Sequence, residues 1–263
     1  MILPTLSAFK IAAALICSAW ITSLISAVFG MAGGLILMGI LNSILTVSLA
    51  MIAHGVIQCV ANGTRAILIR QSIVWGPLTT YCVGFLIGVL VSFAVSFQPD
   101  KSLVGISLGC VAFLPRLMDR LKLALNFAKP SHSLTCGILM SVSQLTAGAA
   151  GPVLDAFFAQ TSMSKYQIVA TKAASQTISH LAKVCYFWIA IGFKGESSSP
   201  LELTFLLTLL LACLASIVGT HHGKALLDRF SESAFRKWYR VILEVVGSLI
   251  LISSIVELLV SKS

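Results

Sequence analysis

The chain has 263 residues, of which 57% are hydrophobic and only 10% are charged, and its mean hydropathy is +0.98. About a quarter of the residues of a soluble domain are charged, so this composition excludes a soluble globular protein, a disordered chain and a nucleic-acid-binding protein. At about 20 residues per crossing, the length allows on the order of eight to ten membrane helices joined by short loops. We therefore predict an all-α, polytopic membrane protein whose surroundings are the lipid bilayer.

The net charge of +9 comes from 18 Lys and Arg against 9 Asp and Glu. Most basic residues lie between apolar segments, so we attribute them to orientation in the membrane. The seven cysteines all fall inside apolar segments and show no C-x-x-C spacing. This pattern suggests neither a disulfide framework nor a metal site, and we expect no metal and no cofactor.

Ten apolar segments follow one another along the chain. They cover residues 8–29, 34–49, 50–70, 73–97, 101–118, 132–147, 152–163, 166–192, 201–220 and 236–260. The first has no clear cleavage site, so we interpret it as a membrane helix rather than a signal peptide. We divide the chain into a first transmembrane repeat (1–118), a basic linker (119–131) and a second transmembrane repeat (132–263).

The two halves are related by a shift of 118 residues. This shift places Gly30-Met31-Ala32-Gly33-Gly34 on Gly148-Ala149-Ala150-Gly151-Pro152. It also places His54, Gln58, Asn62 and Arg65 on Lys172, Gln176, His180 and Lys183. Farther along, a shift of 135 residues places Gly84 and Gly88 on Gly219 and Gly223. Internal duplication of this kind is typical of secondary transporters.

The basic residues indicate a topology. If all ten segments cross the membrane, eleven Lys and Arg lie on one side and four on the other, whereas eight crossings nearly abolish this bias. The positive-inside rule therefore predicts ten crossings with both termini outside. Five crossings per half make the repeats inverted, which suits alternating access. The segments beginning at 34 and 152 are short for a full crossing and could instead be re-entrant.

The two glycine clusters interrupt apolar stretches. Glycine is a poor helix former, and Pro152 suits the first turn of a new helix. A helix that begins inside the membrane presents free amides and the positive end of its dipole. We therefore predict that the amides of Gly33, Gly34 and Gly151 bind an anion. The alternative is helix packing through small residues.

A polar stripe follows each glycine cluster, at a spacing that places its members on one helix face. Ionisable side chains inside a span cost at least ~2.5 kcal/mol each at the bilayer centre and usually face a cavity or a partner. Neither stripe contains an acid, so a bound anion is the natural complement. We predict substrate-binding roles for His54, Gln58, Arg65, Lys172, Gln176 and His180.

Each of these residues also has a structural interpretation. Arg65 and Lys183 could reach the membrane surface from a helix end, and Lys172 could form an ion pair with Asp155. The histidines and glutamines could be contacts between helices. Asp155, one turn after the second glycine cluster, either positions Lys172 or carries a coupled proton, and it is our candidate for coupling.

The sequence resembles the sulfite exporter TauE/SafE family, also called the four-toluene sulfonate uptake permease family. The likeness covers nearly the whole chain. It is carried by the glycine motif at 30–34, its repeat at 148–152, the run Ala170-Thr171-Lys172-Ala173-Ala174-Ser175-Gln176 and Gly219-x-x-x-Gly223. The family's fuller glycine run is replaced here by Met31-Ala32 and Ala149-Ala150. The resemblance implies transport of a small sulfur-containing anion, such as sulfite or a sulfonate, in the bacterial inner membrane.

The sequence thus predicts a secondary transporter of small anions rather than an enzyme, with a coupling proton or ion and a homo-oligomer as further partners to consider. Three alternatives stay open. An anion channel would use the same stripes, but its flux would not saturate. An intramembrane enzyme would need a nucleophile–base pair or a metal ligand set, and neither is evident. A structural or assembly protein would need only packing, and its stripes should tolerate neutral replacements.

Overall fold

The computed structural model describes residues 3–29, 32–95, 97–122, 125–158, 161–193, 203–227, 229 and 232–260. Over these residues the chain forms α-helices and one short 3-10 helix, with no strand. The first half contains α1 (Leu3–Phe29), α2 (Ala32–Ile44), α3 (Val47–Leu68), η1 (Arg70–Ser72), α4 (Trp75–Ala94), α5 (Lys101–Ala112) and α6 (Leu114–Arg120). The second half contains α7 (Pro130–Thr146), α8 (Gly151–Phe158), α9 (Lys165–Phe193), α10 (Leu203–Leu227) and α11 (Glu232–Val260).

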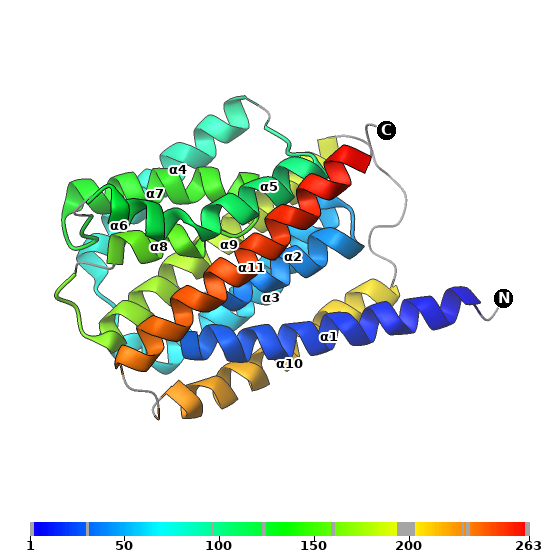
Figure 1. The fold of residues 1–263 in the computed structure, drawn as a ribbon, viewed down its shortest axis with the longest axis horizontal. Helices are drawn as coiled ribbons and strands as arrows, with labels where there is room; N and C mark the ends of the chain where they lie inside the picture. The colour runs from blue at the N-terminus through cyan, green and yellow to red at the C-terminus, as the bar shows by residue number, and fades with distance from the viewer. Residues whose placement is uncertain are drawn as a thin grey trace.

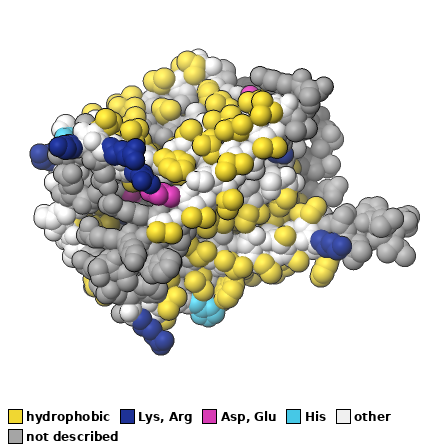
Figure 2. Space-filling view, in the orientation of Figure 1, with side chains coloured by type: hydrophobic (Ala, Val, Ile, Leu, Met, Phe, Trp, Pro, Cys, Tyr) yellow, Lys and Arg dark blue, Asp and Glu magenta, His cyan; other side chains and the backbone are white. Residues whose placement is uncertain are grey.

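The all-α membrane fold predicted from composition is confirmed. Among the described residues, four helices are long and apolar enough to cross a membrane: Phe9–Val28, Val47–Leu68, Trp75–Ala94 and Leu203–Leu226. Large apolar side chains are exposed on the outer faces of α4 and α10, including Leu86, Leu90, Leu210 and Leu214. Figure 2 shows such side chains spread over the middle of the molecule, as expected for a surface that faces lipid.

One predicted segment and the linker differ from the structure. Residues 101–118 divide into α5 and α6, which meet at Phe113. Pro115 accounts for the division, because proline has no backbone N–H and its ring clashes with the preceding turn of a helix. Helices also occupy both ends of the predicted linker 119–131, since α6 extends to Arg120 and α7 begins at Pro130.

The helices that follow the glycine clusters are short. At 1.5 Å per residue, α8 is about 12 Å long and α2 about 20 Å, against a hydrocarbon core of about 30 Å. Each is shorter than the hydrocarbon core, as expected for a half-helix that begins at a break inside the membrane. Gly30 and Met31 lie outside the described residues, and the first break is described from Ala32 onward.

Helices from the two halves of the chain pack on one another in three layers. α1 lies along α10 in one outer layer, and α4 lies along α7 in the other (Figure 1). Between them α3 packs along α9, and α5 packs along α11. This arrangement buries the inner faces of α3 and α9, which carry the two polar stripes.

Glycines allow the two outer helix pairs, α1 with α10 and α4 with α7, to pack closely. A Cβ atom added to Gly84 of α4 would overlap with the backbone of Leu134 in α7. One added to Gly219 of α10 would overlap with the backbone of Trp20 in α1. The two glycines paired by the shift of 135 residues therefore both pack against the first long helix of the other half, as small residues do at membrane helix interfaces.

We expect Gly84→Ala to lower the stability of the folded protein by about 1–3 kcal/mol, because backbone atoms of Leu134 cannot rotate away from the added methyl group. Gly76→Ala is a matched control on the same helix, since a Cβ atom there has no neighbour within 4 Å. It should leave the Tm in detergent unchanged or raise it slightly, because alanine is the better helix former. Equal Tm values for the two variants would contradict the close α4–α7 contact.

Candidate functional site

The two polar stripes meet where α3 packs along α9. His54, Gln58, Asn62 and Arg65 of α3 are buried, and so are Gln176, His180 and Lys183 of α9. The spacing of each stripe places its members on the inner face of its helix, as predicted. Burial contradicts the alternative that Arg65 and Lys183 reach the membrane surface; Lys183 is fully buried, and α9 continues beyond it to Phe193.

Lys183 lies at the centre of a buried hydrogen-bond cluster. Its Nζ atom is 2.7 Å from His54 Nδ1 and donates to the carbonyl oxygen of Gly148 at 2.7 Å. The other ring nitrogen of His54, Nε2, is 2.8 Å from the carbonyl oxygen of Gly34. A carbonyl oxygen can only accept, so His54 Nε2 carries a proton and donates it. Lys183 and His54 therefore connect the two glycine breaks.

Gln144 of α7 and His180 extend this cluster. Gln144 Nε2 is 2.8 Å from His180 Nδ1 and donates to the carbonyl oxygen of Gly148 at 3.3 Å. The ring centroids of His180 and His54 are 5.2 Å apart. Sequence reasoning missed Gln144, although a buried amide one turn before a glycine break is itself a polar signal. We call Lys183, His54, His180 and Gln144 the central cluster.

The rest of the α3 stripe forms a chain of amides and a guanidinium. Asn62 Nδ2 donates to Gln58 Oε1 at 3.1 Å, and Arg65 Nη1 donates to Asn62 Oδ1 at 3.3 Å. The side chain of Gln58 lies over Gly34, where an added Cβ would be 3.4 Å from Gln58 Oε1. Gln58 Nε2 is buried and has no hydrogen-bond partner among the described residues. The first glycine break thus faces an amide donor that is available to a ligand.

Lys172 forms an ion pair with Asp155 of α8, the alternative considered for it. The exposed fractions of the two side chains are only 12% and 11%. Lys172 Nζ also lies 5.7 Å from the centroid of the Phe158 ring, close enough for a cation–π contact. These contacts fasten the half-helix α8 to the long helix α9.

The glycines of the breaks lie where the half-helices begin. Gly33 and Gly34 are in the first turn of α2, and Gly151 is the first residue of α8. In this turn the backbone amides have no partner within the helix. A Cβ atom added to Gly33 would overlap with the carbonyl oxygen of Thr22, so close packing also applies at this position. Gly148 has a φ of +74°, a conformation that favours glycine.

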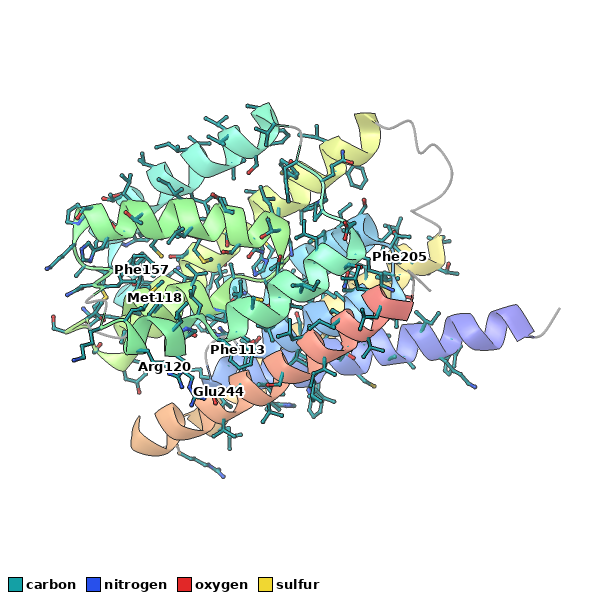
Figure 3. The ribbon with its side chains drawn as sticks, turned by 45° about the horizontal axis from the view of Figure 1, so that its top comes forward. Phe113, Met118, Arg120, Phe157, Phe205 and Glu244 are labelled. Carbon is teal, nitrogen blue, oxygen red and sulfur yellow. The ribbon has the colours of Figure 1, made fainter. Side chains whose placement is uncertain are left out.

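The helix α6 covers α8 from outside. Figure 3 shows Met118 of α6 beside Phe157 of α8, whose side chain is buried. Arg116 Nη1 of α6 pairs with Glu244 Oε2 of α11 at 2.7 Å on the surface. The half-helix α8 is therefore packed against α6, α7 and α9.

The arrangement suits a small anion. In the described part of the chain, the central cluster contains a buried lysine and no carboxylate, and two half-helices begin beside it. Helix N-termini and an ammonium group both favour negative charge. The described residues include no group of three or more metal-ligating side chains placed to hold a metal ion.

One comparison with known proteins gives a match. A family model described as "Sulfite exporter TauE/SafE" matches residues 15–250. No curated protein and no solved structure shows significant similarity to the chain. The matched region includes both glycine breaks, both stripes and the central cluster, and it covers most of the chain. The chain belongs to the sulfite exporter TauE/SafE family, whose members are membrane transporters.

Proposed function

We propose that this protein is a secondary transporter that carries small sulfur oxyanions, such as sulfite or an organic sulfonate, across the bacterial inner membrane by alternating access. The anion binds between the two glycine breaks. Its ligands are the amides of Gly33, Gly34 and Gly151 and the side chains of His54, Gln58, Gln176 and His180, while Arg65 and Lys172, at the ends of the two stripes away from His54 and Lys183, attract the anion toward this site. The observation that carries the proposal is the buried Lys183, which bridges the two breaks without a described acid to neutralise it.

A bound anion offsets the energetic cost of burying an ammonium group at this position. Burial of an ammonium group without a counter-charge costs several kcal/mol. Lys172 already pairs with Asp155, so its charge is largely compensated, whereas the contacts of Lys183 are an imidazole and a carbonyl. The available amide of Gln58 beside Gly34 supplies a further donor for an oxyanion.

The packing of the helices supports two related repeats, which in our proposal are inverted and work by alternating access. α1 pairs with α10, and the equivalent helix of the second half, α7, pairs with α4. Such reciprocal pairing is what two repeats related by a two-fold axis produce. Figure 2 shows most of the visible basic side chains at the end of the molecule opposite the start of α1. We assign that end to the cytoplasm by the positive-inside rule.

The proposal predicts selective stabilisation by one or a few sulfur oxyanions. Purified protein in detergent is unfolded thermally with sulfite, sulfate, thiosulfate, sulfoacetate or taurine, and with chloride, phosphate and acetate as comparison anions. A ligand at 100 times its Kd stabilises the folded state by about 2.7 kcal/mol. A flat response over all of these compounds would overturn the proposal.

Two further measurements complete this test. Gln58→Leu removes the available donor at nearly constant volume. It should raise the Kd of the stabilising ligand about tenfold, as expected for a lost hydrogen bond. The exposed Gln167 of α9 gives the matched control Gln167→Leu, which should bind like the unmodified protein. In proteoliposomes, saturable flux supports a transporter, and flux that rises linearly with concentration supports a channel instead.

A further inference from the structure

We propose that Lys183 and His54 share one exchangeable proton, which the protein takes up when an anion binds between the glycine breaks. This inference rests on the proposed function and deepens it, because it names the group that couples the anion to a proton. It assigns coupling to the Lys183–His54 pair instead of Asp155, which is engaged by Lys172.

The hydrogen bonds of the pair limit it to one excess proton. Gly34 fixes a proton on His54 Nε2, so His54 Nδ1 accepts a hydrogen bond from Lys183 as long as the imidazole is neutral. If His54 Nδ1 gains a proton, that N–H points at Lys183 Nζ, which must then be a neutral amine to accept it. The same proton therefore resides on one group or the other, and the 2.7 Å contact lets it move between them directly.

The groups around Lys183 offer no compensating negative charge in the described part of the chain. From α3 the facing titratable group is His54, and from α9 itself it is His180. α7 contributes the neutral Gln144, and α2 has no ionisable residue. The only acid of α8, Asp155, pairs with Lys172, which lies about 16 Å from Lys183 along α9.

The phenols of α4 and α9 and the second imidazole do not change this balance. Tyr186, three residues after Lys183, donates to the carbonyl oxygens of Ser92 and Phe97. The hydroxyl group of Tyr81 of α4 donates to the carbonyl oxygen of Ser175, two turns before Lys183. The amide of Gln144 donates to His180 Nδ1, so that nitrogen is unprotonated and the imidazole is neutral. Lys183 and His54 are thus the groups of the central cluster that gain or lose the proton.

Anion binding and proton uptake are linked by these contacts. An isolated buried charge is so unfavourable that a titratable group there gives up its proton instead. An anion at the breaks supplies the missing opposite charge and favours the protonated pair, and the proton comes from solvent. Linkage is reciprocal, so protonation must raise the affinity for the anion by the same factor. For a monovalent anion such as a sulfonate, the anion and the proton together carry no net charge.

The test uses the full chain in detergent with methanesulfonate, a probe that stays ionised and so brings no proton of its own. Calorimetric titration in two buffers with different heats of ionisation gives the number of protons taken up. We expect up to about one proton per bound anion at alkaline pH, and an affinity that falls by up to about tenfold per pH unit. Lys224→Met, at an exposed position near the end of α10, should behave like the unmodified protein.

Lys183→Arg is the decisive variant, because a guanidinium stays protonated in proteins. It should bind methanesulfonate with an affinity independent of pH and without proton uptake. Proton uptake as in the unmodified protein would overturn the assignment to this pair. If the variant does not fold, the inference is tested by the proton uptake of the unmodified protein and by the pH dependence of its affinity for methanesulfonate.

The outcomes separate this inference from the proposed function. Methanesulfonate binding by the unmodified protein without proton uptake would overturn the inference and leave an anion site in place. If none of the sulfur oxyanions binds, the proposed function fails, and the inference fails with it.

Discussion

Lys172→Met is expected to lower the free energy of unfolding by on the order of 3–5 kcal/mol. The reason is that Asp155 then remains as a buried carboxylate without its counter-charge. The surface pair of Arg116 and Glu244 gives a matched control, because its side chains are 53% and 36% exposed. Arg116→Met should cost no more than about 1 kcal/mol. Equal losses in the two variants, measured by unfolding in detergent, would show that the Lys172–Asp155 pair does not hold α8.

The double variant Lys172→Met/Asp155→Leu distinguishes the two interpretations of Lys172. Removal of both charges should recover most of the stability, because no unpaired charge remains. We expect this stable double variant to bind the sulfur oxyanion at least about tenfold more weakly, since a cation that attracts the anion toward the breaks is lost. Unchanged affinity would show that Lys172 acts only by fastening α8 to α9.

Much of the fold follows from patterns that are local in the sequence. Apolar length and glycine spacing located several helices to within a few residues, as for the segment 73–97, which forms α4 at Trp75–Ala94, but the segment 201–220 ends seven residues before α10 does at Leu227. Helical periodicity placed His54 and His180 on inner faces, because a polar residue in an apolar helix avoids lipid. Pro115 was a local signal for the division between α5 and α6, and the prediction did not use it.

The distinction between the two lysines of α9 could not be predicted. Lys172 and Lys183 lie on the same face of one helix, and only the packing of α8 decides which of them meets an acid. The same holds for Gln144, which reaches His180 because α7 ends beside α9. Long-range contacts of this kind depend on how the two halves dock, and spacing within one helix does not contain that information.

The second large effect is expected at Gly148, which joins α7 to α8 with a φ of +74°. An L-residue in this left-handed conformation costs roughly 1–2 kcal/mol. A Cβ atom there would also lie 2.7 Å from the sulfur atoms of Met38 and Met51, which must move aside. Gly148→Ala should therefore lower the Tm and displace the carbonyl oxygen that accepts from Lys183 and Gln144.

This displacement predicts a functional loss as well as a loss of stability. The carbonyl oxygen of Gly148 orients Lys183 Nζ toward His54. If Gly148→Ala displaces this oxygen, the central cluster loses that orientation, and the affinity for the anion should fall. Gly63→Ala is the control at the α3–α9 contact, since its added Cβ would lie 3.7 Å from Thr177, an ordinary contact distance. If both variants kept the same Tm and the same affinity for the sulfur oxyanion, the second break would not require a left-handed residue. A lower Tm and a lower affinity in Gly148→Ala alone would instead show that the backbone at this break positions Lys183, the charged group that binds the anion.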